Sequence, residues 1–131
     1  MTPFDPSALV GRRLDGLFAA WWVADDQRPQ GPIDVWLVGE QGVPTHLTTA
    51  ADWRLVVVEE HPYGDYDMDG LGRVEVLPTA EGTPFARHVG QAVTAVHQDW
   101  DPDHGLTGLA IEFPDGTVHA DSWDGDLRLR D

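Results

Sequence analysis

The fold of this 131-residue chain is decided by residues 109–120, which read LAIEFPDGTVHA. Apolar side chains alternate with small or polar ones over residues 109–113, which is the period of a half-buried β-strand. Pro114-Asp115-Gly116 supplies the turn, and the alternation resumes at Val118 and Ala120. The stretch therefore predicts a β-hairpin.

A similar pattern occurs earlier in the chain at two constant offsets. Residues 9–17, followed by Trp21, align with residues 88–96, followed by Trp100, at an offset of 79 (100 minus 21). Residues 35–55 align with residues 109–129 at an offset of 74 (109 minus 35). We interpret this as an internal duplication. The alternative is chance similarity between hairpins of one small sheet.

The remaining strands follow from the same reasoning. Residues 35–38 and 45–48 predict a first-half hairpin with its turn at 40–42, and the β-branched run at 54–58 predicts a buried strand. Residues 73–77 add a further strand.

The start of each repeat is ambiguous. Val10, Leu14, Leu17 and Trp21 have helical spacing, and so do their equivalents in the second repeat. Glycine residues in both segments and β-branched residues in the second favour strands instead. We expect strands, with a short helix at the start of a half as the alternative.

These elements predict one all-β domain over residues 1–131. Its two similar four-stranded halves, 9–77 and 88–130, are linked by residues 78–87 and form either a barrel or two packed sheets. The length fits one domain, and 41% hydrophobic residues supply enough material for one core.

The net charge of the chain restricts the classes of molecule that we expect it to bind. There are 23 acidic and 8 basic side chains, which leaves a formal net charge of -15. Nucleic acids and anionic lipids would be repelled, so the sequence predicts a basic protein or a cation as partner.

Other features of the composition bear on disulfide and metal chemistry, on the cellular compartment and on the source genome. There is no cysteine, so disulfides and thiolate metal sites are excluded. The polar, proline-containing start and the lack of a long apolar run predict a cytoplasmic protein. All eight basic residues are arginine, which is typical of a high-GC bacterial genome.

The second repeat also carries a family resemblance. Residues 109–129, preceded by Val89-Gly90, resemble the "apolar strand, DG turn, strand, D-x-L" unit of small actinobacterial β-repeat proteins. Some of those resemble immunity proteins that travel with secreted polymorphic toxins. The resemblance implies an immunity function and carries over no functional residue.

Two acidic loops are the most specific local motifs. Asp65, Asp67 and Asp69, followed by Gly70, match the start of a calcium loop. The closing bidentate position holds Val76, which excludes an EF-hand and predicts weak calcium binding at most.

The second loop repeats the alternate-aspartate spacing at 99, 101 and 103. For both loops three interpretations stay open: solvated turns, a calcium site, or an acidic surface for a partner. No cofactor other than weakly bound calcium is expected.

No catalytic constellation is present. The six histidines lack metalloprotease spacing, and no G-x-S-x-G motif occurs. The sequence predicts a protein that is not an enzyme, with its histidines as ordinary strand residues.

The six tryptophans divide into expected core residues and candidates for a docking surface. We expect Trp21, Trp36 and Trp53 in the core, and Trp22, Trp100 and Trp123 at the surface. Indoles anchor interfaces while carboxylates steer the encounter. The candidate partner-binding residues are Asp65, Tyr66, Asp67, Asp69, Trp100, Asp101 and Asp103.

The predicted function is therefore binding of a basic protein, of the kind an immunity-type inhibitor of a toxin or nuclease performs. The alternative is a β-barrel that binds a small ligand or a cation.

Overall fold

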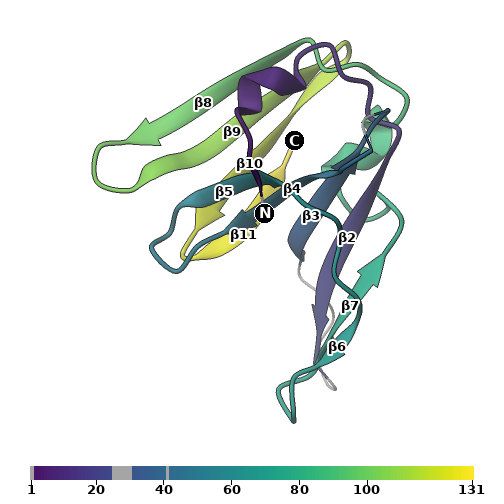
Figure 1. Cartoon of the computed structure of the whole chain (residues 1–131), viewed down its shortest axis with the longest axis vertical. Helices are drawn as coiled ribbons and strands as arrows, with labels where there is room; N and C mark the ends of the chain where they lie inside the picture. Colours follow the sequence, from purple (N-terminus) through teal and green to yellow (C-terminus); the bar gives the residue numbers. More distant parts are fainter. Residues whose placement is uncertain (1, 25–30, 41) are drawn as a thin grey trace.

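The computed structural model describes residues 2–24, 31–40 and 42–131, and it is all-β. Its strands form two open antiparallel sheets (Figure 1). The first has the order β1-β5-β4-β3-β2-β7-β6. Its strands are β1 (Thr2–Pro3), β2 (Gly16–Val23), β3 (Pro32–Val38), β4 (Thr45–Thr49), β5 (Leu55–Glu59), β6 (Tyr66–Asp67) and β7 (Arg73–Leu77).

The second sheet is a four-stranded meander with the order β11-β10-β9-β8. Its strands are β8 (Ala95–Asp101), β9 (Gly105–Phe113), β10 (Gly116–Trp123) and β11 (Asp126–Arg130). The predicted hairpin over residues 109–120 is confirmed, because β9 and β10 pair from Phe113↔Gly116 to Gly108↔Asp121. The predicted strands at 35–38, 45–48, 54–58 and 73–77 correspond to β3, β4, β5 and β7, while Gln41 of the first-half turn lies outside the described residues.

A short 3₁₀ helix precedes the first strand of each meander. η1 (Pro6–Leu9) leads to β2, and η2 (Pro84–His88) leads to β8. Each begins with proline after a side-chain cap, from Asp5 in η1 and Thr83 in η2. The ambiguous segments thus become strands after a short helix. No helix among the described residues is long and apolar enough to cross a membrane.

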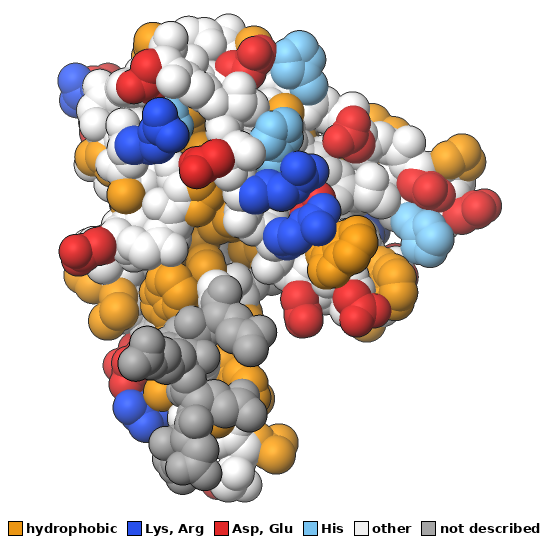
Figure 2. Space-filling model, turned by 180° about the vertical axis from the view of Figure 1, so that it is seen from behind, with side chains coloured by type: hydrophobic (Ala, Val, Ile, Leu, Met, Phe, Trp, Pro, Cys, Tyr) orange, Lys and Arg blue, Asp and Glu red, His pale blue; other side chains and the backbone are white. Residues whose placement is uncertain are grey.

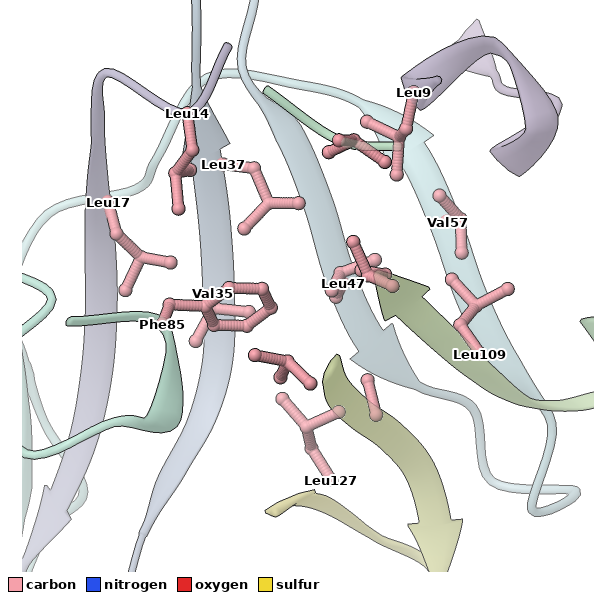
Figure 3. Packing of buried hydrophobic residues seen from close by; sticks show 14 of the residues in the cluster. Leu9, Leu14, Leu17, Val35, Leu37, Leu47, Val57, Phe85, Leu109 and Leu127 are labelled. Atoms are coloured by element: carbon pink, nitrogen blue, oxygen red, sulfur yellow. The ribbon is translucent and has the colours of Figure 1, made fainter. Parts of the chain in front are cut away.

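The two sheets bury their inner faces against each other. Alternate residues of β2–β5 and β9–β11 point into one main hydrophobic cluster. Figure 3 shows Leu17, Val35 and Leu47 of the first sheet in the same buried cluster as Leu109 and Leu127 of the second. A smaller cluster around Ala20, Trp36 and Val74 lies on the outer face of the first sheet. Strand periodicity alone assigns neighbouring residues to these two faces.

Backbone hydrogen bonds relate the two halves reciprocally. Four bonds cross between residues 11–14 and 90–93, and shifting by 79 turns each bond into another of the set. The bonds are Gly11 N to Val93 O (2.8 Å), Gly90 N to Leu14 O (2.7 Å), Leu14 N to Gln91 O (2.9 Å) and Val93 N to Arg12 O (2.9 Å). Between these bonds Arg13 forms a β-bridge with Ala92, which is the residue that the shift of 79 makes equivalent to Arg13. The crossing segments therefore have local pseudo-twofold symmetry.

Glycine is required at the entry to this crossing. Gly11 and Gly90 have φ of +87° and +92°, a left-handed conformation that side chains with a Cβ adopt at a cost. The two halves share the order of a 3₁₀ helix and four meander strands, whereas β6 and β7 have no counterpart among the described strands of the second half. The repeat boundaries 9–77 and 88–130 stay a prediction.

The barrel alternative is wrong. The described strands make two open sheets, and the single Arg13↔Ala92 bridge connects the crossing segments without joining the sheet edges. The strands of each sheet pair only with one another, so the sheets meet through side chains and through the backbone bonds of the crossing segments. The predicted link at 78–87 contains most of η2, whose Phe85 is fully buried in the main cluster.

We expect Leu47→Ala to lower the free energy of unfolding by about 3 kcal/mol, because it opens a cavity at a fully buried position of the main cluster. The matched control is Leu71→Ala, at a leucine that is 68% exposed, which should change stability by less than about 0.5 kcal/mol. Urea unfolding at neutral pH measures both. Equal effects of the two substitutions would contradict the described core.

Candidate functional site

The two acidic loops lie far apart. β6 and the turn before β7 occupy the lower end of the molecule in Figure 1, whereas the β8–β9 turn is at the left. Asp65, Tyr66, Asp67 and Asp69 are thus separated from residues 100–103. The structure does not bring the predicted partner-binding residues into one surface.

The carboxylates of the first loop serve their own backbone. Asp65 Oδ1 accepts a hydrogen bond from the Val76 amide (2.7 Å), and Asp67 Oδ1 accepts one from the Asp69 amide (2.9 Å). Such local bonds are typical of aspartate in turns. In the part of the chain that the structure describes, no three His, Asp or Glu side chains are grouped as metal ligands.

The second loop is organised by Asp101. Its Oδ1 accepts hydrogen bonds from the amides of Asp103 (2.8 Å) and His104 (3.2 Å). The Asp103 amide bond, with the His104 side chain, lowers the pKa of Asp101. Asp101 therefore stays ionised and holds the turn.

The exposure of the tryptophans agrees with the prediction except at Trp53. Trp36 is fully buried and Trp21 packs against the main cluster, as predicted, and Trp22, Trp100 and Trp123 are exposed, also as predicted. The prediction that Trp53 is in the core is wrong, since it is 52% exposed. Trp53 sits in the β4–β5 turn with φ of +67°, and that turn carries it away from the inner face of the sheet.

Three exposed tryptophans lie on three hairpin ends. Trp53 belongs to the β4–β5 turn, Trp100 is next to last in β8, and Trp123 ends β10. Trp100 and Trp123 are 66% and 61% exposed, so neither ring is used by the core. Exposed apolar side chains that gather in one patch are typical of surfaces that a partner covers.

These hairpin ends adjoin one another. Thr49 Oγ1 donates a 2.9 Å hydrogen bond to the carbonyl of Gly125, which joins the β4–β5 and β10–β11 ends. A Cβ at Gly105 would lie 3.8 Å from Arg54 Cδ and 4.0 Å from Trp100 Cζ3, which places the β8–β9 end beside the β4–β5 end.

Each of the three tryptophans has an aspartate next to it in the chain: Asp52 beside Trp53, Asp101 beside Trp100 and Asp124 beside Trp123. Figure 2, in which the hairpin ends lie at the right, shows hydrophobic and acidic side chains side by side there. Arg54 lies 4.0 Å from Asp52, so this basic residue offsets only part of the charge. We define the tip surface as Trp53, Trp100 and Trp123 with Asp52, Asp101, Asp103 and Asp124.

An arginine supports the tip surface from one side. The Arg128 guanidinium lies over the Trp123 ring, 4.2 Å from its centroid. Two hydrogen bonds of 2.9 and 2.7 Å join Arg128 to the carboxylate of Asp121. Burial would raise the pKa of Asp121, but Arg128 and, more weakly, Arg130 lower it below its ordinary value.

A second cluster lies on the outer face of the first sheet, around His46. This imidazole is 7% exposed and stacks on Trp36, with ring centroids 4.5 Å apart. Its Nε2 is 2.8 Å from Asp34 Oδ1, and its Nδ1 is 3.0 Å from Glu60 Oε2. Both nitrogens can donate to these carboxylates only when the ring carries both protons.

Tyr63 closes this cluster. Its hydroxyl donates a hydrogen bond to Asp34, and its ring meets Trp36 edge to face at 5.1 Å. Burial, together with Asp34, raises the pKa of Tyr63 above its ordinary value, so the phenol keeps its proton and remains a donor. The cluster fastens residues 60–63 to the sheet.

The sequence did not reveal this cluster, because His46 has the pattern of an ordinary strand residue. Once Trp36 and His46 are paired across β3 and β4, outward-facing Asp34 falls on the same face. That pairing was available from the predicted hairpin. The position of Glu60 and Tyr63 depends on the path of the chain after β5.

The comparisons with known proteins do not add to the site. No family model matches the chain, and searches of the curated proteins and of the solved structures returned no significant match.

We expect His46→Leu to lower the free energy of unfolding by about 3 kcal/mol, because it leaves the buried Asp34 carboxylate without its imidazole partner. His97→Leu is the matched control, since His97 also contacts a carboxylate at 2.8 Å but its side chain is 67% exposed. That change should cost less than about 0.5 kcal/mol. Urea unfolding measures both, and equal losses would argue against a structural role for the His46 cluster.

The Asp121 carboxylate should make stability depend on pH. Because its pKa is lowered in the folded protein, its contribution is present above the ordinary value of 3.8 and is lost as the pH falls through the folded value. Asp121→Asn should cost about 1 kcal/mol at pH 7, a figure reduced for the partial exposure of Arg128.

The difference between wild type and Asp121→Asn should shrink as urea unfolding is repeated from pH 7 towards pH 3. Asp126→Asn on the neighbouring strand, at an exposed aspartate, should leave stability nearly unchanged throughout. A constant difference for Asp121→Asn would show that the pair with Arg128 does not contribute.

Proposed function

We propose that this chain is a non-enzymatic binding protein that docks a basic protein on the tip surface. The observation that carries the proposal is the exposure of Trp53, Trp100 and Trp123 on three adjoining hairpin ends. Tryptophan is enriched among the residues that contribute most to protein interfaces.

Charge supports a basic partner. The indoles stand among Asp52, Asp101, Asp103 and Asp124, and the whole chain has a formal charge of -15. Such a field accelerates encounter with a positively charged surface and repels acidic proteins. Added salt should therefore slow association.

An immunity-type inhibitor is the specific role we propose. Enzymes that cut nucleic acids bind phosphates through basic surfaces, and an acidic protein with aromatic anchors is complementary to such a surface. The resemblance of residues 109–129 to β-repeat proteins, some of them immunity-like, points in the same direction.

The other predicted residues play a secondary part in this proposal. Asp65, Tyr66, Asp67 and Asp69 lie at the β6–β7 end, away from the tip surface. Their carboxylates contribute to the overall charge, and Asp65 and Asp67 bond to local backbone. The aspartates of this loop serve as a matched control, because they are also acidic but lie outside the tip surface.

The test is an affinity pull-down from the source organism at low and high salt, followed by an activity assay of any captured basic protein. We expect the wild type to retain a basic protein at low salt and to inhibit its toxic or nuclease activity. The double variant Trp53→Ala/Trp100→Ala should lose this partner, because two exposed anchors are removed without touching the core.

The control is Asp65→Asn/Asp67→Asn/Asp69→Asn, which should retain the partner with only the weakening that a smaller net charge produces. Capture of no basic protein would contradict the proposed function. Equal retention by the double tryptophan variant would place the interface elsewhere.

A further inference from the structure

A groove lies between the two sheets and borders the tip surface, with which it shares Trp123 and Asp124. It has a volume of about 710 Å³. One side is formed by the end of β2, the start of β3 and the residue after β6, the other by the β10–β11 hairpin, and Gly82 and Pro84 at the start of η2 also line it. Sites for small molecules commonly have volumes of about 300–1,000 Å³.

The walls of this inter-sheet groove are apolar and partly aromatic. Trp22, Ile33 and Met68 line it from the first sheet, and Trp123 and Leu129 line it from the second. Trp22 is held in place because its indole N–H donates a 2.8 Å hydrogen bond to the carbonyl of Leu71. The groove thus has an indole on each side, one of them fixed.

Carboxylates outnumber basic side chains among the described residues that line the groove. Asp124 and Asp126 contribute carboxylates to the lining, and both residues are exposed. Of the described residues that line it, Arg128 is the one basic side chain, and its charge is matched by two hydrogen bonds to Asp121. Among the described lining residues, two carboxylates therefore stand beside one arginine and the apolar walls.

Trp123 also displays the chemistry that such a site would use. The guanidinium of Arg128 already lies against its ring at 4.2 Å, so this indole binds a flat cation within the protein itself. The ring is nevertheless 61% exposed, which leaves area for a second contact.

We propose that the inter-sheet groove is a binding site for a small organic cation with a flat aromatic body. The aromatic body packs between the walls that carry Trp22 and Trp123, and the cationic group faces Asp124 and Asp126. A neutral molecule of the same shape would lose the attraction of the carboxylates, and an anion would be repelled. The groove shares Trp123 and Asp124 with the tip surface, but this proposal concerns a different ligand from the basic protein and is tested separately.

The experiment titrates the full chain with benzamidine, and with benzamide and benzoate as neutral and anionic molecules of similar shape. Binding is followed through the indole N–H resonances in NMR spectra and by calorimetry. Benzamidine should shift the resonances of Trp22 and Trp123 but not that of Trp100. Benzamide should bind about tenfold more weakly, since one cationic contact is worth on the order of 1.4 kcal/mol.

Two variants locate the site. Trp123→Ala should weaken benzamidine binding at least about fivefold by removing one aromatic wall. Asp126→Asn should weaken benzamidine while leaving benzamide unchanged, because only charge is removed. Trp100→Ala, at an exposed indole outside the groove lining, should bind all three probes as the wild type does.

Equal affinity for the three probes would overturn the proposal, and so would unchanged benzamidine binding in both groove variants. Should Trp123→Ala fail to fold, as its spectrum would reveal, Asp126→Asn decides the matter alone. Failure here would not touch the proposed function, because the partner test changes Trp53 and Trp100, which lie outside the groove lining.

Discussion

The burial of two inner sheet faces against each other is the interaction on which the rest of the structure depends. Each meander satisfies its backbone hydrogen bonds internally but leaves one apolar face that only the other sheet covers. The crossing segments at 11–14 and 90–93 set how the two halves meet, because their amides and carbonyls exchange bonds reciprocally. A shared core and a symmetric crossing thus make one domain from two sheets of unequal size.

That arrangement decides which surfaces are available. The outer face of the first sheet is partly covered by residues 60–63, which the His46 cluster holds there, while β7 extends the sheet by pairing with β2. The β4–β5, β8–β9 and β10–β11 ends stay uncovered, and they present the three exposed tryptophans of the tip surface. The inter-sheet groove lies where the added strand β6 and the start of β3 approach the β10–β11 hairpin. Both surfaces therefore arise where the two sheets stop covering each other.

The acidic side chains have different roles in the turns, on the sheets and around the exposed tryptophans. Within the turns, Asp67 and Asp101 bind nearby amides and stabilise local geometry. On the sheets, Asp34 and Asp121 are paired with His46 and Arg128, so these charges are largely compensated. The remaining carboxylates around the tryptophans are solvent-exposed, and they determine the sign of any partner. Net charge thus describes the long-range field, whereas the individual contacts decide which acids are free to act.

The sequence by itself determined the strands, because alternation and turn residues are local properties: β9–β10 and the 79-residue offset between Gly11 and Gly90 could be read directly. It could not choose between a barrel and two sheets, since that depends on which strand edges meet. It misplaced Trp53, whose exposure follows from one left-handed turn, and it overlooked His46, whose partner Glu60 lies beyond β5. Only the tertiary structure separated the two acidic loops and brought Trp53, Trp100 and Trp123 together, because spatial proximity between distant hairpins is set by sheet packing and leaves no local pattern in the chain.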